Sequence, residues 1–349
     1  MGVTRPHVSC LRAVALGLLA MACTAPTATP PPASLEPPEA SAAAPAPVPL
    51  PATEPVMLRR ATVSVTGAQW PEFVAQAKGF YAREGLTIDT LVVDVRALIP
   101  SLIGGSFEIS FASATDLVLA IDRGANLVAV GSGLDRAPYA LITPPTLRTF
   151  ADLKGKRVGA TTPNDAYTVV IRDILSKNGL DPDHDVEFLY GGSSNQRVAA
   201  LQSGGLDAAL VLPPQERELT ERGFHALANT LDYYPNLQLS LTAVRRDWAE
   251  EHADVLRRYL RAQAAASRWL NDPANRAEAI QILGEATRAS PDAAAYTYEV
   301  FVTRVRAYPD DGCIQRSGME GLLQVLARAG LEEGTPSVEK YIDRRWCPS

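Results

Sequence analysis

The histidines are the first residues to test for catalytic chemistry. The four of them lie far apart in the chain, at His7, His184, His225 and His252. The sequence has no H-E-x-x-H, paired C-x-x-C or G-x-S-x-G string, so a zinc hydrolase and a serine hydrolase both lack their essential groups. The KGKRVGATT string also lacks the G-x-x-x-x-G-K-S/T spacing of a phosphate loop. We therefore expect no enzymatic activity and no cofactor or metal.

Polar and aromatic residues in four short strings could instead hold a solute without changing it. The strings are TGAQWP at 66–71, SAT at 113–115, TTPNDAYT at 161–168 and PPQE at 213–216. Each lies between a predicted strand and a predicted helix, and the free N–H groups and positive dipole end of a helix start suit anionic groups. The candidate ligand-binding residues in these strings are Gln69, Trp70, Ser113, Thr115, Thr161, Thr162, Asp165, Tyr167, Pro213 and Gln215.

The hydroxyl and carboxylate candidates have a second interpretation as helix N-caps. Ser113 with Asp116, and Thr162 with Asp165, have the residue types of a cap followed by an acid in the first turn. A cap residue at the edge of a cleft can also touch a ligand, so the two roles can hold together.

The larger candidates are open to two interpretations as well. Trp70 offers a flat apolar wall with one N–H donor, or it packs in the core. Tyr167 could wall the opposite side. Arg96 precedes a predicted helix, where it could pair with a carboxylate, sulfonate or phosphate, or remain a solvated surface arginine.

Alternating strands and helices must position these strings. The alternation runs from residue 59 to about residue 130 and starts again near residue 157, which predicts two α/β lobes built on parallel sheets. The apolar stripe over 70–81, for example, predicts a single helix. Only helices are predicted after about Thr242. Ligands of open parallel sheets bind outside the carboxyl ends of the strands, where the four strings lie.

An internal echo supports two lobes of similar construction. LIGGSFEI at 102–109 and LQSGGLDA at 201–208 share the form L-x-x-G-x-x-acid-apolar. In each, the glycine is expected to stop a helix, and Glu108 or Asp207 stands at the entry of the next strand. We interpret these two acids as structural.

The first 58 residues are predicted to be a signal peptide followed by a tether. Basic residues, a short apolar run and small residues in 1–22 are typical of a secretory signal peptide. Cys23 follows Ala22 directly and resembles the lipidated cysteine of a bacterial lipobox, although an ordinary signal cut that leaves Cys23 incidental stays open. The proline- and alanine-rich remainder of 23–58 is expected to be an extended tether.

Loss of the signal peptide would leave two cysteines besides Cys23. Cys313 and Cys347 both lie near the C-terminus, and an oxidising compartment would favour a disulfide between them. Two unpaired buried thiols are the alternative. The net charge of −6 and the pI near 5.4 argue against a nucleic-acid partner, and we expect a monomer.

Five strings in order resemble one family over roughly residues 60–290. They are FVAQAKGFYAREGLTID, SLIGGSFEISFASATDLVLAIDRGANLVAV, FADLKGKRVGA, VAALQSGGLDAALVLPP and RYLRAQAAASRWLNDP. The chain resembles substrate-binding proteins of ABC importers, in the NMT1/THI5-like branch with the sulfonate, taurine, nitrate and thiamine-precursor binders. The segment 300–349 departs from that pattern, so we assign no function to it.

The resemblance implies a type II periplasmic-binding-protein clamshell of the α/β class. Lobe one would comprise 60–140 plus 241–349 with its C-terminal helices, and lobe two would comprise 141–240. The chain would cross between the lobes near 131–145 and 230–244, and these two strands would act as the hinge.

The resemblance also implies a function outside the cytoplasm. A small organic and possibly anionic solute would be captured between the lobes and delivered to an ABC transporter permease, while a lipid at Cys23 holds the protein at the membrane, facing the periplasm or the cell exterior. A solute-binding sensor or scaffold without transport is the main alternative. A relative that makes the thiamine pyrimidine depends on a cysteine-rich motif, and this sequence has no such cluster.

Overall fold

The computed structural model describes residues 55–136, 138–331, 334 and 336–348. All of them belong to one compact unit, 53–349. The predicted signal peptide, Cys23 and most of the predicted tether lie outside the described residues. The last residues of that tether are not tether, because the first strand already begins at Val56 and Leu58 is buried in the core.

Lobe one is built on a five-stranded sheet with the strand order β2-β1-β3-β10-β4. Its parallel strands β1 and β3 flank one another, and β10 runs antiparallel between β3 and β4. The strands are β1 (Val56–Thr62), β2 (Leu86–Val92), β3 (Ile109–Ser113), β4 (Leu127–Ser132) and β10 (Ser240–Arg245).

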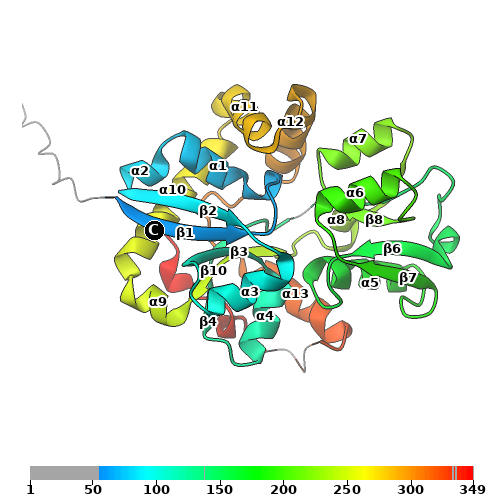
Figure 1. Ribbon diagram of the computed structural model, residues 1–349, viewed down its shortest axis with the longest axis horizontal. Coiled ribbons are helices and arrows are strands. Elements are labelled where there is room, and N and C mark those ends of the chain that lie inside the picture. Colours follow the sequence, from blue (N-terminus) through cyan, green and yellow to red (C-terminus); the bar gives the residue numbers. More distant parts are fainter. Residues whose placement is uncertain (1–54, 137, 332–333, 335, 349) are drawn as a thin grey trace, which may run out of the picture. The chain divides into compact units, whose positions relative to one another are not determined.

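The strands of lobe two have a corresponding order. Its strands pair as β8-β5-β9 and β6-β7, and a parallel bridge between Val158 and Ala208 joins the two pieces in the order β7-β6-β8-β5-β9. The strands are β5 (Ala140–Thr143), β6 (Lys156–Ala160), β7 (Val186–Tyr190), β8 (Ala209–Val211) and β9 (His225–Asn229). Figure 1 shows β6, β7 and β8 with their helices grouped apart from β1, β2 and β3.

The prediction of purely parallel sheets is wrong at one strand in each lobe. β5 is antiparallel to both of its neighbours, and so is β10. These are the strands by which the chain enters a lobe from the other one. The other strands end at the edge that faces the opposite lobe, so a strand that starts at this edge must run back against them.

Helices cover both sheets. Lobe one carries α1 (Trp70–Ala77), α2 (Phe80–Arg83), α3 (Val95–Ile103) and α4 (Ala114–Asp122), and lobe two carries α5 (Ala166–Lys177), α6 (Ser194–Gln202), α7 (Gln215–Glu221) and α8 (Thr230–Tyr233). The C-terminal part adds α9 (Arg246–Glu251), α10 (Ala253–Asn271), α11 (Arg276–Thr287), α12 (Pro291–Tyr298) and α13 (Arg316–Arg328). The single helix predicted over 70–81 is broken, because Gly79 takes the left-handed φ of 67° between α1 and α2. Within the described residues, no helix combines the length and the apolar character that a membrane span requires.

The echoed acids tie two strands together in each lobe. The backbone N–H of Arg59 on β1 donates to Glu108 (2.7 Å), and the backbone N–H of Arg157 on β6 donates to Asp207 (2.9 Å). The guanidinium of each arginine binds the same carboxylate. Glu108 and Asp207 are thus structural in the same way, 49 and 50 residues from their partners.

One buried amide joins the two chain crossings between the lobes. The chain crosses between Ser132 and Ala140 and returns between Asn229 and Ser240. Gln238 is fully buried on the return, and its Nε2 lies 3.1 Å from the carbonyl of Leu134 and 2.7 Å from that of Ser240. Both crossings are therefore held together at the hinge. Near them, α13 packs against α4 of lobe one and α5 of lobe two, so it contacts both lobes.

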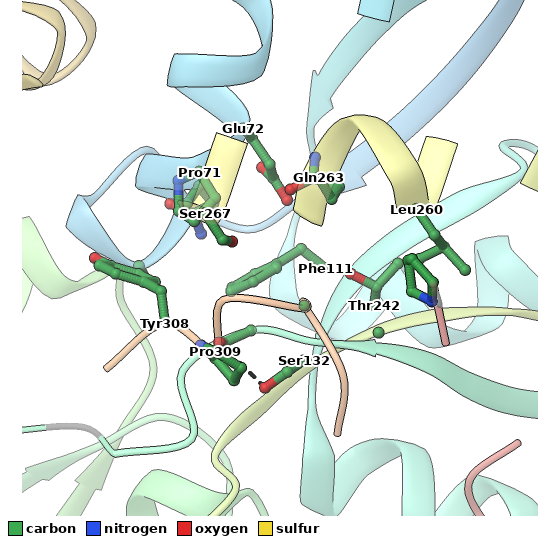
Figure 2. Close-up of a pocket in the computed structure, with 16 residues that line it drawn as sticks. Pro71, Glu72, Phe111, Ser132, Thr242, Leu260, Gln263, Ser267, Tyr308 and Pro309 are labelled. Atoms are coloured by element: carbon green, nitrogen blue, oxygen red, sulfur yellow. Dashed lines mark hydrogen bonds between the residues drawn. The ribbon is translucent and has the colours of Figure 1, made fainter. Parts of the chain in front are cut away.

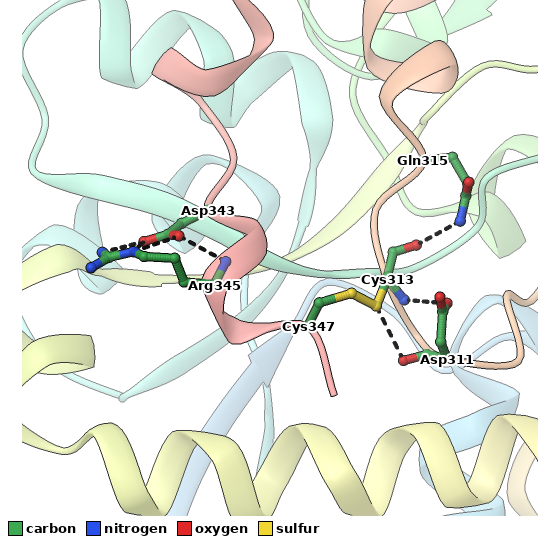
Figure 3. The surroundings of a disulfide bond; sticks show 6 residues. All are labelled: Asp311, Cys313, Gln315, Asp343, Arg345 and Cys347. Atoms are coloured by element: carbon green, nitrogen blue, oxygen red, sulfur yellow. Dashed lines mark hydrogen bonds and ion pairs between the residues drawn. A yellow bond between two sulfur atoms is a disulfide. The ribbon is translucent and has the colours of Figure 1, made fainter. Parts of the chain in front are cut away.

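The last residues of the chain cover the free edge of the lobe-one sheet. Ile342 forms a parallel bridge with Ala129 of β4, and Trp346 is buried. The Cα atoms of Cys313 and Cys347 lie 5.5 Å apart, a separation that suits a disulfide (Figure 3). The segment without an expected function therefore has a structural role, because it protects an edge strand.

Candidate functional site

A cavity of about 520 Å³ lies where the strands of both lobes end. Lobe one lines it with residues that follow β1, β2 and β3, and lobe two with residues that follow β6, β7 and β8. The polar and aromatic residues of the lining are Ser64, Thr66, Gln69, Asp94, Phe111, Ser113, Asp116, Tyr139, Thr161, Asp165, Tyr167, Ser193, Ser194, Gln196, Arg197 and Ser240. A volume of this size suits a small organic molecule.

Five α-helices, α1 and α3 to α6, begin at the cavity, and a side chain of the protein caps four of them, whereas α1 has no side-chain cap. Ser113 accepts from the N–H of Asp116 at the start of α4 (3.4 Å), which confirms the predicted cap. Thr162 is not the cap of α5, because Asp165 accepts from the N–H of Thr168 (2.8 Å). Asp94 and Ser193 cap α3 and α6. Two of the five positive helix ends, those of α3 and α5, therefore already hold a carboxylate.

An aromatic and cationic wall stands on the lobe-two side. The rings of Tyr139 and Tyr167 meet edge to face, with centroids 5.7 Å apart. The Arg197 guanidinium lies 4.3 Å from the centre of the Tyr167 ring and donates to the carbonyl of Gly192 (2.9 Å). Arg197 is only 6% exposed, and its Nε has no hydrogen-bond partner in the described part of the chain.

Two carboxylates from opposite lobes, Asp116 and Asp165, line the same cavity. Burial, together with the charge of the nearby Asp165 carboxylate, raises the pKa of Asp116 in lobe one to about 7, while Arg123 acts in the opposite direction. Burial also raises the pKa of Asp165 in lobe two, against hydrogen bonds from Thr161 and Thr168 and the charge of Arg197. No side chain of the described residues donates a hydrogen bond to Asp116.

Replacement of Asp116 by asparagine is expected to stabilise the ligand-free protein at high pH. The folded pKa lies above the ordinary value of 3.8, so the folded state binds this proton more tightly than the unfolded state. The free energy of unfolding should therefore fall as the pH rises from about 4 to about 7, and the variant escapes this loss. After allowance for screening by cavity water, we expect Asp116→Asn to raise the free energy of unfolding by about 2 kcal/mol at pH 8. The increase should be less than half of that at pH 5, and urea unfolding measures both values.

The matched control is the exposed Asp89 on β2. Asp89→Asn should change the free energy of unfolding by less than about 0.5 kcal/mol at both pH values. A gain for Asp116→Asn that is the same at pH 5 and pH 8 would show that Asp116 is not the titrating group.

The sequence candidates are distributed over three hollows and the core. Those that line the 520 Å³ cavity are Gln69, Ser113, Thr161, Asp165 and Tyr167. Arg96 and Thr162 line a neighbouring groove of about 510 Å³ beside α3 and α4, where Arg96 is exposed. Pro213 and Gln215 line a third hollow of about 340 Å³ between α6, α7 and α11. The side chains brought together at one place are thus about half of the set.

Trp70 and Thr115 are core residues, so the interpretation of Trp70 as a cleft wall is wrong. Both are fully buried. The Trp70 indole donates to the carbonyl of Ala279 (3.1 Å) and meets the Tyr298 ring edge to face at 5.9 Å. It packs against the C-terminal helices, whose position the local string could not reveal.

Four residues that line the cavity were not among the candidates predicted from the sequence. They follow two strands, β2 and β7, that the sequence did predict. Asp94 follows β2, and Ser193, Ser194 and Arg197 follow β7. The rule that ligands bind at the carboxyl ends of strands would have selected both loops. A capping-box spacing, Ser193 with Gln196, marks the second loop in the sequence.

A second, much smaller cavity lies behind the wall of the first. It measures about 20 Å³, room for one water, and Figure 2 shows Phe111 in its lining. Gln69 and Phe111 line both cavities. Glu72 lines the small one and forms a buried ion pair with Arg60, whose guanidinium lies 5.5 Å from the centre of the Phe111 ring. The side chains at the floor of the large cavity thus rest on a buried ion pair.

The family model described as NMT1/THI5 like matches residues 68–276, more than half of the chain. The chain belongs to the NMT1/THI5-like family. This confirms the resemblance stated from the sequence strings.

Solved structures show the fold of this NMT1/THI5-like protein. The alkanesulfonate-binding protein SsuA from Xanthomonas axonopodis pv. citri, bound to MOPS, has a TM-score of 0.68 at 22% identity and covers 84% of this chain and 99% of its own. The periplasmic nitrate-binding protein NrtA from Synechocystis PCC 6803 has a TM-score of 0.71 at 16% identity. The match covers 82% of this chain and 84% of the NrtA chain. The predicted type II clamshell with two α/β lobes is confirmed.

Curated relatives of this NMT1/THI5-like protein match over shorter stretches. The nitrate/nitrite binding protein NrtA of Synechococcus elongatus is 30% identical over 41% of this chain and 34% of its own length. The 4-amino-5-hydroxymethyl-2-methylpyrimidine phosphate synthase of Schizosaccharomyces pombe is 31% identical over 44% of this chain and 43% of its own length. The chain thus spans about a third of the length of the first of these relatives and less than half of the second.

Proposed function

We propose that this protein captures a small organic solute between its two lobes, outside the cytoplasm, and delivers it to the permease of an ABC importer. The observation that carries the proposal is the 520 Å³ cavity, which both lobes line with the ends of their strands. Closure of such a hinge over a solute needs no chemical step. The names of the relatives, which bind alkanesulfonate, nitrate or nitrite, support this class of function.

The lining of the cavity favours binding over catalysis. Among the described residues that line it there is no histidine and no cysteine. Its serines and threonines therefore lack a neighbouring imidazole that could activate them as nucleophiles. The cysteines at 313 and 347 lie at the C-terminal tail instead, so they do not supply the cysteine-rich motif on which the thiamine-pyrimidine enzyme depends.

A lipid at Cys23 would keep the protein near its transporter, as one part of the same proposal. A tether over the residues before β1 would then let the lobes sample the space around the membrane. Mass spectrometry of the native N-terminus tests this anchor, and an unmodified Cys23 would refute it. We also propose that Cys313 and Cys347 form a disulfide, and that the protein acts as a monomer.

A thermal-shift screen tests solute capture. The protein is mixed in turn with sulfonates, carboxylates, nitrate, pyrimidines and amines, and a specific solute is expected to raise its melting temperature by mass action. X-ray scattering with the same solute should show a smaller radius of gyration, because the lobes close.

Two tryptophan variants control the screen. Ser64→Trp fills the cavity from the lobe-one side and should abolish the shift, whereas Ser106→Trp places the same side chain at an exposed loop and should leave it intact. A shift that survives Ser64→Trp would mean that the solute binds elsewhere, and no shift with any class would leave the proposed function without support.

A further inference from the structure

The charged groups of the cavity are predominantly acidic. Asp94, Asp116 and Asp165 line it, and Arg197 is the one basic residue among the described residues of the lining. Arg197 and Asp165 attract each other within lobe two. One guanidinium can offset only one of the three carboxylates, so the lining keeps an excess of negative charge.

Asp165, which is buried, and Asp116, which is half-buried, oppose closure of the cleft when both are charged. Asp116 belongs to lobe one and Asp165 to lobe two, both line the same cavity, and the charge of Asp165 makes Asp116 harder to ionise. Arg123 lies on the far side of Asp116, along the neighbouring groove, and Asp94 and Arg96 stand at the start of α3. A positive group between the two carboxylates would turn this repulsion into an attraction across the cleft.

Two of the positive helix ends at the cavity, those of α3 and α5, are poorly available to an anion. The carboxylates of Asp94 and Asp165 already cap α3 and α5, so an anionic ligand at those helices would meet a like charge. The unpartnered Nε of Arg197, in a side chain 6% exposed, is an independent sign that the lining is incomplete without a ligand. It would suit a weak acceptor on the same solute.

The remaining lining is apolar and aromatic. Tyr139 and Tyr167 form an edge-to-face pair beside the acids. The apolar residues around them include Val63, Leu98, Leu134, Leu212 and Leu239. These side chains fit a flat or apolar body that is much larger than an inorganic anion such as nitrate.

We propose that the solute carries a cationic or N–H-donating nitrogen group, such as an amine, an amidine or an amino-substituted heterocycle, and that Asp116 and Asp165 bind this group from opposite lobes. The inference rests on the proposed function of solute capture and names the chemical class of the solute. Each carboxylate then accepts a charge-assisted hydrogen bond, and the bound nitrogen couples binding to closure of the lobes.

The experiment uses probes that share one ring and differ in charge. Benzylamine and benzamidine are the cations, benzyl alcohol is the neutral probe, and benzoate and benzenesulfonate are the anions, with nitrate and bicarbonate as small anions. Calorimetry on the full protein should show binding of the cations at least tenfold tighter than that of the alcohol, and no measurable binding of the anions.

Isosteric variants assign the effect to the two acids. Asp116→Asn and Asp165→Asn keep the size of the side chain, and asparagine remains a good N-cap for α5. Each variant should weaken cation binding at least tenfold, whereas Asp89→Asn on the exposed part of β2 should not change it.

The possible outcomes separate the inference from the function on which it rests. Tighter binding of an anion than of the cations, or cation binding that Asp116→Asn and Asp165→Asn leave unchanged, would overturn the proposed solute class while solute capture stands. If no probe of either charge binds or makes the lobes close in X-ray scattering, solute capture and the inference fail together.

Discussion

Replacement of Arg60 by alanine is expected to lower the free energy of unfolding by about 3–5 kcal/mol, because it leaves the carboxylate of Glu72 buried without its cation. The Arg60 side chain is 3% exposed and that of Glu72 is 10% exposed, so water cannot take the place of the lost partner. Arg60 lies on β1 and Glu72 on α1, in the centre of lobe one. Urea unfolding at pH 7 measures the loss.

Two comparisons distinguish loss of a buried charge pair from loss of any arginine. Arg261→Ala breaks the exposed ion pair with Glu84, and its cost should stay below about 1 kcal/mol. A double variant with Arg60→Met and Glu72→Leu replaces the buried pair with apolar side chains and should recover most of the stability. A double variant as unstable as Arg60→Ala would show that packing around Arg60, and not its charge, is the source of the loss.

The consequence of Arg60→Ala should extend to the candidate site. The guanidinium lies 5.5 Å from the centre of the Phe111 ring, and Phe111 lines both the small cavity and the large one (Figure 2). Without the guanidinium, the ring loses a cation–π contact on its inner side. We therefore expect weaker solute binding in any Arg60→Ala protein that remains folded.

Cys347→Ser is expected to lower the free energy of unfolding of the oxidised protein by about 3–4 kcal/mol, the second largest effect. The proposed disulfide would close a loop of 34 residues, and loss of that link enlarges the conformational freedom of the unfolded chain. In the folded state it would also hold the tail that covers β4 beside the segment that carries Asp311 and Cys313 (Figure 3). Denaturant unfolding without reductant measures the change.

Reductant provides the internal control for this prediction. Dithiothreitol should lower the stability of the native protein to that of Cys347→Ser and should leave the variant unchanged. Cys313→Ser should match Cys347→Ser, and the double variant should be no worse than either single one, because one bond is lost in each case. A native protein that is insensitive to reductant would show that the two thiols are not bridged.

Each lobe contributes different residues to the cavity. Lobe one contributes Asp116 and a floor that rests on a buried ion pair, and lobe two contributes Asp165, Arg197 and the paired tyrosines. Gln238 and α13 hold the lobes at the hinge. A solute that binds Asp116 and Asp165 together, as proposed above, would stabilise the closed form of the two lobes.

The local elements of this protein could be predicted from its amino-acid sequence. Alternating apolar periods predicted the strands and helices of both lobes, and the echo of 102–109 in 201–208 predicted their common construction, because both signals depend only on neighbouring residues. The same local logic predicted Ser113 as a cap and located three of the loops that line the cavity, those after β1, β3 and β6. The family and its fold were also recognisable from short strings.

Which side chains contact one another could not be predicted locally, because it depends on how distant segments pack. Trp70 belongs to the core because α11 and α12, more than 200 residues away, pack over it. Asp116 and Asp165 come together because the chain crosses between the lobes twice and turns the ends of both sheets towards one cavity. Burial and the sign of the charge at a site are properties of such distant contacts, so no local pattern encodes them.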